Sequence, residues 1–148
     1  MSDSLHVRYK PLEGFSGTLS YAHEGDAGFD LRATHDAIIE PLSRATVRCG
    51  FAIEVPEGHG GLVIPRSGLA SKHGIAVLNA PGLVDSGYRG EVMVVLHNTD
   101  AHNPFRVEKG DRIAQMSIVA MPQVSLVESD ALDETQRGSG GFGSSGTR

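Results

Sequence analysis

The sequence has 148 residues, close to the commonest size of a single folded domain. Its formal net charge of −5 argues against a protein that coats a nucleic-acid duplex, because that binding depends on Lys and Arg neutralising phosphates. No apolar run approaches the roughly 18 residues that span a bilayer, and the first residues lack the pattern of a leader peptide. The single cysteine, Cys49, excludes an intramolecular disulfide. We therefore expect one cytoplasmic domain without membrane or nucleic-acid partners.

Short β-favouring segments follow one another along the chain, separated by turns that contain Pro or Gly. Residues 5–9 alternate apolar and polar side chains as a half-buried strand does, and residues 13–28 are expected to form a loop that closes with Asp30 in a turn. Further strands are predicted over residues 37–40, 46–55, 61–64, 92–96, 105–107 and 112–119. Only residues 67–73 favour a helix, with Ser67 near its N-cap and Gly74 as its stop. This order predicts an all-β barrel or sandwich.

The composition changes near Glu128. Residues 1–128 are predicted to form the β domain, whereas residues 129–148 read as an acidic link followed by a Gly/Ser-rich C-terminal arm. The arm has too little apolar surface to hold itself in place, so we expect it to be flexible until a ligand orders it.

Two segments have the residue types that bind phosphate. Arg66, Ser67 and Gly68 join a predicted strand to the predicted helix, where a guanidinium, a hydroxyl and free amides can converge on one anion. The alternative is an ordinary helix cap with a solvated arginine.

In the arm, Arg137 is a bidentate phosphate donor and Phe142 offers a flat face for a base. Gly143 lets the backbone approach closely, and Ser144 and Ser145 add hydroxyl donors. A plain linker is the alternative that composition alone suggests. The arginine and the phenylalanine favour a functional arm.

The turn-rich stretch at residues 79–91 carries the other candidate groups. Asp85 lies in a turn between apolar residues and is a candidate general base for water, although a turn aspartate often binds its own backbone. Tyr88 can pack against a sugar, or be a rim tyrosine with a solvated hydroxyl.

Two further polar residues stand out. Asp30 can hold a water on a hard cation such as Mg2+, or serve only as a turn residue. Gln115 is polar within an apolar strand and needs a hydrogen-bonding partner if buried. Cys49 is interpreted as a small buried apolar residue, and no P-loop or zinc-hydrolase motif is present.

Five segments occur in a specific order along the chain: residues 27–31, 65–70, 79–91, 110–115 and 137–146. This set resembles the ordered motifs of the trimeric dUTPases, and the resemblance spans residues 27–146. It implies a jelly-roll β domain that forms a homotrimer with active sites shared between subunits. It also implies hydrolysis of dUTP to dUMP and pyrophosphate by water attack at the α-phosphate, using Mg2+. Such an enzyme lowers dUTP and supplies dUMP for dTMP synthesis.

The resemblance implies a role for each matching residue. Asp85 would orient the attacking water, and Tyr88 would leave no room for a ribose 2′-hydroxyl. Uracil would be read by Asn79 and the backbone around three residues: Leu83, Val84 and Met93.

The remaining motif residues would contact phosphates and metal. Arg66, Ser67 and Gly68 match phosphate contacts, Gln115 matches a residue near the α-phosphate and the water, and Asp30 would reach Mg2+ through water. The arm that closes over the nucleotide would use these residues: Arg137, Phe142, Gly143, Ser144 and Ser145. Ser145 stands where threonine is usual, and the role of Arg112 stays open between ligand contact and bracing.

Two other functions compete with dUTP hydrolysis. The related dCTP deaminases share the β architecture, but they lack the C-terminal arm and the spacing from Asp85 to Tyr88. A nucleotide sensor would bind dUTP without hydrolysing it, and the intact Asp85 argues against that reading.

Overall fold

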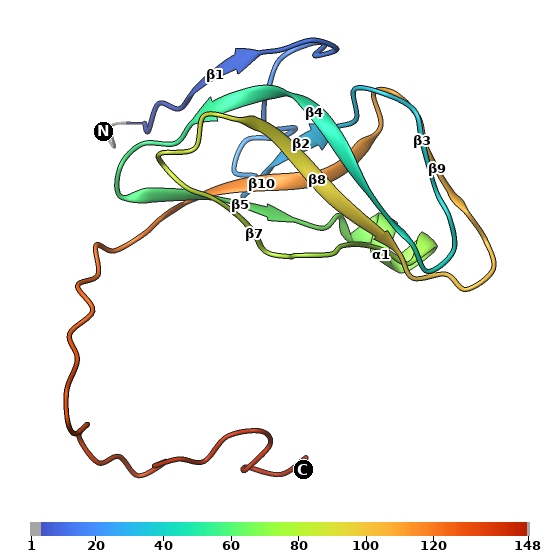
Figure 1. Ribbon diagram of the computed structural model, residues 1–148. Coiled ribbons are helices and arrows are strands. Elements are labelled where there is room, and N and C mark those ends of the chain that lie inside the picture. The colour runs from blue at the N-terminus through green and yellow to red at the C-terminus, as the bar shows by residue number, and fades with distance from the viewer. Residues whose placement is uncertain (1–3, 148) are drawn as a thin grey trace.

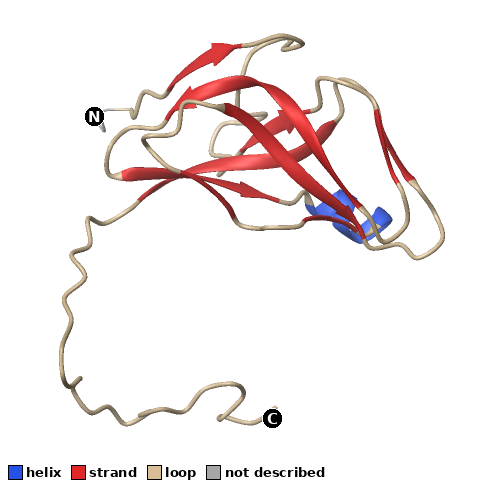
Figure 2. Cartoon of the chain, viewed as in Figure 1, coloured by secondary structure: helices blue, strands red, loops and turns tan. Residues whose placement is uncertain are grey.

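The computed structural model describes residues 4–147, and in this range the chain forms ten short strands and one helix (Figures 1 and 2). In chain order these are β1 (Arg8–Pro11), β2 (Phe29–Arg32), β3 (Ala37–Ile39), β4 (Arg44–Glu54), β5 (His59–Ile64), α1 (Ser67–His73), β6 (Ile75–Val77), β7 (Gly82–Val84), β8 (Glu91–Asn98), β9 (Phe105–Val107) and β10 (Arg112–Ala120). The predicted all-β class is confirmed.

The strands form two four-stranded antiparallel sheets and a separate two-stranded ribbon. One sheet has the order β1-β4-β8-β6, the other has the order β2-β10-β5-β7, and β3 pairs with β9. The sheets enclose a core of apolar side chains from both, in which Phe51, Leu31, Leu96 and Met116 are almost completely buried. This jelly-roll-like sandwich leaves β7 and β6 as edge strands, which matters for the site below.

A bulge in β4 sets where β8 begins. Arg48 lies opposite Met93 and Ala52 lies opposite Glu91, so β4 has two more residues than β8 between these pairs. Gly50, inside the bulge, has a φ of 74°. A Cβ there would lie 2.6 Å from the Thr34 side chain, so only glycine fits.

Some predicted elements are shifted and others were missed. The first strand covers Arg8–Pro11 rather than residues 5–9, because those later residues pair with β4. Residues 29–32 were expected to close a loop, but they form β2 against β10, with Phe29 and Leu31 buried. Asp30 is therefore a strand residue and not a turn residue. The three-residue strands β6 and β7 were not predicted.

The helix has the predicted extent but a different N-terminus. Gly74 ends it in the left-handed conformation with a φ of 64°, as expected. The N-cap is Arg66, and no side chain caps the helix, so Ser67 is its first residue and its hydroxyl does not cap.

Beyond β10, residues 121–147 contain neither helix nor strand and extend away from the sandwich (Figure 1). Met121 is partly buried against Gly60, but the large apolar side chains after it are exposed, and Leu126 and Leu132 are almost fully so. Within the described range, the helix is too short to cross a bilayer.

Candidate active site

A pocket of about 200 Å³ lies between β7 and the start of β8. Its walls include most of the predicted base-reading and sugar-contacting residues: Asn79, Leu83, Val84, Asp85, Tyr88 and Met93. Because β7 pairs only with β5, one side of its backbone has no ladder partner and can bind a planar ligand. The Asn79 amide lies close to the backbone of Gly82. A Cβ placed on Gly82 would be 3.6 Å from the amide nitrogen of Asn79.

Asp85 follows β7 directly and is exposed. Its carbonyl oxygen accepts a hydrogen bond from the Tyr88 N–H at 3.0 Å, which closes the turn. Among residues 4–147 no group donates a hydrogen bond to its carboxylate, unlike a turn aspartate that binds its own backbone. Both carboxylate oxygens are therefore free to hold a water molecule.

Tyr88 is held by its hydroxyl group. The hydroxyl donates to the Glu91 carbonyl oxygen at 2.9 Å, and the ring covers Gly90. A Cβ on Gly90 would lie only 2.6 Å from the ring carbon that bears the hydroxyl. The tyrosine is thus a fixed wall of the pocket rather than a freely rotating side chain.

Two charged residues that support this turn were missed by the sequence reasoning. Arg89 donates hydrogen bonds to the carbonyl oxygens of Ser86 at 2.6 Å and Tyr88 at 2.9 Å. Glu91 binds Arg48 across the sheet at 2.9 Å. Both residues lie inside the segment 79–91. The sequence of a turn does not indicate which carbonyl oxygen an arginine will bind, or which cation a glutamate will bind.

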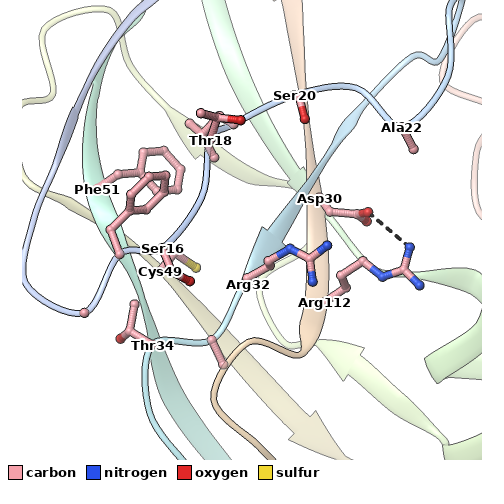
Figure 3. Close-up of a pocket in the computed structure, with 14 residues that line it drawn as sticks. Ser16, Thr18, Ser20, Ala22, Asp30, Arg32, Thr34, Cys49, Phe51 and Arg112 are labelled. Atoms are coloured by element: carbon pink, nitrogen blue, oxygen red, sulfur yellow. Dashed lines mark ion pairs between the residues drawn. The ribbon is translucent and has the colours of Figure 1, made fainter.

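A second cluster gathers around Asp30 (Figure 3). Its carboxylate pairs with NH1 of Arg112 at 3.6 Å, the ion pair drawn in Figure 3, and with Nε of Arg66, also at 3.6 Å. Arg66 also donates to the Arg112 carbonyl oxygen at 3.0 Å. Arg112 therefore braces both partners, which gives it a structural role in this chain.

Gln115 lies beside this cluster for a reason of register. It is opposite Asp30 of β2 on one side and Ile64 of β5 on the other. Its amide nitrogen donates to the Pro65 carbonyl oxygen at 3.0 Å, which gives the half-buried side chain a protein partner. Ser67 and Gly68 are exposed at the start of α1 close by in sequence.

The structure does not bring these two clusters together in one chain. Val84 lies opposite Gly61, so Asp85 follows the chain toward Gly60, whereas Arg66 lies beyond the other end of β5. Arg66 comes six positions after Gly60, which is at most about 20 Å of extended chain. One subunit thus presents two half-sites.

The arm residues lie away from both clusters. Arg137 donates only to the Gly140 carbonyl oxygen, at 2.8 Å, and Phe142 is fully exposed. Gly143, Ser144 and Ser145 take part only in local turns or in no hydrogen bond of the described range. None of the five predicted arm residues contacts the pocket in this state.

The donor set around Asp30 suits a metal held through water. No group of three or more Asp, Glu, His or Cys side chains in the described range is close enough to enclose an ion. Mg2+ usually retains several waters and binds through one or two carboxylates together with substrate phosphates. One carboxylate cannot enclose the ion, and the positive charges of its two arginine partners oppose direct metal binding, so Asp30 could act only through a water of the hydration shell.

Comparison with known proteins shows the family of the chain. The family model for dUTPase matches residues 17–146. The chain belongs to the dUTPase family. A deoxyuridine 5′-triphosphate nucleotidohydrolase from Tropheryma whipplei strain Twist is 51% identical over 125 residues, covering 84% of this chain and 86% of the relative. One from Rhodococcus erythropolis is 47% identical over 146 residues, covering 99% of this chain and 89% of the relative.

Solved structures of dUTPases share the fold. The Staphylococcus bacteriophage 80alpha dUTPase with dUPNHPP superposes with a TM-score of 0.88 at 27% identity, covering 97% of this chain and 99% of the phage chain. A mutant dUTPase from phage phi11 of S. aureus has a TM-score of 0.79 at 22% identity, covering 86% of this chain and 98% of the phage chain, and supports the fold alone. That phage protein is described with a structural Mg(II) ion.

Proposed function

We propose that the chain hydrolyses dUTP to dUMP and pyrophosphate by attack of water on the α-phosphate. The observation that carries the proposal is the pocket between β7 and β8, where Asn79, Asp85 and Tyr88 surround an unpaired strand edge in a member of the dUTPase family. The relatives from Tropheryma whipplei and Rhodococcus erythropolis are named for this activity.

The free edge of β7 supports uracil selection. Uracil presents an acceptor, a donor and an acceptor along one edge, and the backbone of Leu83 and Val84 with the Asn79 amide offers complementary groups. Cytosine reverses part of this pattern, and each group left unpaired costs about 1–3 kcal/mol. The base-reading role therefore falls on these residues and on the backbone at Met93.

Asp85 and Tyr88 would act on the water and on the sugar. Two carboxylates of the described range line the pocket, and the oxygens of Glu91 are bound to Arg48 and Gly50, so Asp85 is the one that can orient a water and accept its proton. The Tyr88 ring, fixed by Glu91, would exclude a 2′-hydroxyl by contact.

Phosphate binding would require more than one subunit. Because Asp85 lies beside one end of β5 and Arg66 lies beyond the other, we expect one α-phosphate to take these two residues from different subunits. A homotrimer with shared active sites resolves this, with Arg66, Ser67, Gly68 and Gln115 contributed by a neighbour. The Gln115 amide oxygen remains free beside the Pro65 carbonyl for that contact.

The arm has the reach to close over a neighbour's site. Arg137 comes sixteen positions after Met121, which is at most about 58 Å of extended chain. Arg137, Gly143, Ser144 and Ser145 would then bind phosphates, and Phe142 would stack on the base. Its present exposure leaves the Phe142 ring available for such stacking.

Mg2+ fits this scheme on the substrate rather than in the protein. Bound to the triphosphate, it would neutralise phosphate charge during the displacement. Asp30 would hold one of the waters of its hydration shell, while Arg66 stays within reach of both Asp30 and the phosphates. A cytoplasmic location stays a prediction of the sequence.

Pyrophosphate release from dUTP, compared with dCTP, dTTP and UTP, tests the activity. We expect turnover of dUTP alone at low micromolar enzyme; equal turnover of all four would refute the selection argument, and ammonia from dCTP would indicate a deaminase. Asp85→Asn should bind a non-hydrolysable dUTP analogue but lose turnover by about 10²-fold or more. A parent chain that binds the analogue without any turnover would instead be a sensor.

Subunit mixing tests the shared site. Asp85→Asn and Arg66→Ala chains should each be inactive, and unfolding and refolding them together should restore activity, since some sites then combine an intact Asp85 with an intact Arg66. Light scattering should give three times the 15.7 kDa chain mass. A monomer with full activity, or an inactive mixture, would exclude shared sites.

A further inference from the structure

Glu91, the first residue of β8, connects the pocket to the bulge of β4. Its side chain is only 14% exposed, and both carboxylate oxygens are used. Oε2 accepts a hydrogen bond from Nε of Arg48 at 2.9 Å, and Oε1 accepts the backbone N–H of Gly50 at 3.0 Å. The carboxylate therefore occupies the place that the bulge leaves without a strand partner.

The backbone of the same residue holds Tyr88. The Glu91 carbonyl oxygen accepts the Tyr88 hydroxyl at 2.9 Å, and both residues line the pocket. Two residues of β4 hold the Glu91 side chain, and the Glu91 carbonyl oxygen holds the Tyr88 hydroxyl. That hydrogen bond sets the position of the Tyr88 ring. The ring has no other hydrogen-bonding group to fix it.

We propose that Glu91 is a positioning residue for sugar discrimination, which sets the distance of the Tyr88 ring from the sugar through its bridge to Arg48 and Gly50. This rests on the proposed function, because it assigns a role within the same site. Glu91 itself makes no contact with the substrate in this scheme. Its loss should admit a ribose by letting β8 and the phenol move together.

Glu91→Gln breaks half of the bridge with the smallest change of shape. The new amide oxygen can still accept from Gly50, but the amide nitrogen would face the Arg48 guanidinium, a donor against a donor. We expect the ratio of kcat/KM for dUTP to that for UTP to fall about tenfold, with kcat for dUTP within about threefold of the parent value.

Asp36→Asn is the matched control. The Asp36 carboxylate also accepts a long-range backbone N–H, that of Lys109 at 2.8 Å, but it lies outside the pocket. This acid-to-amide change should leave the dUTP/UTP ratio unchanged even if it lowers the melting temperature. A ratio that falls equally in both variants would mean that general destabilisation, and not Glu91, controls the discrimination.

Arg48→Met removes the other partner of the bridge, at a side chain that is 43% exposed. It should lower the ratio in the same direction, and it decides the question if Glu91→Gln does not fold. A double-mutant cycle with Tyr88→Phe then tests the path, since the effect of Glu91→Gln should nearly vanish once the hydroxyl is gone. Additive effects would overturn the proposed path.

The outcomes separate this inference from the proposed function. A parent chain without dUTP turnover would refute the function. A parent that prefers dUTP to UTP, together with Glu91→Gln and Arg48→Met variants that keep the preference within about twofold, would refute the positioning role alone.

Discussion

Gly90→Ala is expected to remove most dUTP turnover while the domain stays folded. The Tyr88 ring covers Gly90 so closely that an added methyl carbon would lie 2.4 Å from the hydroxyl oxygen and 2.6 Å from the carbon that bears it. Ordinary contact begins at 3.4 Å, so the ring must move by about 1 Å. That movement breaks the hydrogen bond from the phenol to Glu91.

The structure also indicates why stability should survive. Gly90 is not among the glycines with positive φ, so its backbone conformation accepts alanine without strain. The clashing atoms belong to the far end of a side chain that is 41% exposed, so the ring can move outward once its hydrogen bond to Glu91 is broken. The melting temperature should therefore stay constant or rise slightly, as for other compatible Gly→Ala changes.

A displacement of about 1 Å at a substrate-contacting ring costs on the order of 10²-fold in rate. We expect kcat/KM for dUTP, measured by pyrophosphate release, to fall by that factor, with a weaker preference over UTP. Gly87→Ala is the control in the same turn, because nothing lies within 4 Å of its added Cβ and its φ is not positive. Full activity of Gly90→Ala would refute the claim that the ring position matters.

Three further results are expected. Burial, with the nearby Glu91 charge, raises the pKa of the Cys49 thiol to about 12. At pH 8 the thiol should therefore react with a disulfide reagent only after the protein unfolds. Rapid labelling of the folded protein would contradict this. Asn98→Ala should lower the free energy of unfolding by about 2–4 kcal/mol in urea titrations. The buried Asn98 amide donates to two carbonyl oxygens and accepts one N–H, and the substitution removes all three hydrogen bonds. A loss below about 0.5 kcal/mol would contradict this role. Removal of residues 137–148 should lower kcat/KM for dUTP by about 10²-fold or more. Light scattering should show the same oligomer, lighter only by the mass of the deleted residues. A normal kcat would exclude a closing role for the arm.

Much of the framework follows from local pattern. The β-favouring runs over residues 46–55 and 112–119 predict β4 and β10, and Gly74 predicts the end of α1, because these signals depend only on neighbouring residues. The strands β2, β6 and β7, of three or four residues, were not predicted, although β3 and β9, which are as short, were. β2 and β7 exist because β10 and β5 pair with them, which is a long-range property.

The site divides in the same way. The sequence by itself determined the all-β class, the ordered motifs and the identities of the groups at Asp85, Tyr88 and Arg66, because residue types and their order are local information. Only the tertiary structure decided that Asp85 and Arg66 lie at opposite ends of β5, and that Glu91 meets Arg48 across a bulge. Forty-three positions separate that last pair, and their contact depends on strand register, which arises only when the sheets assemble around the core.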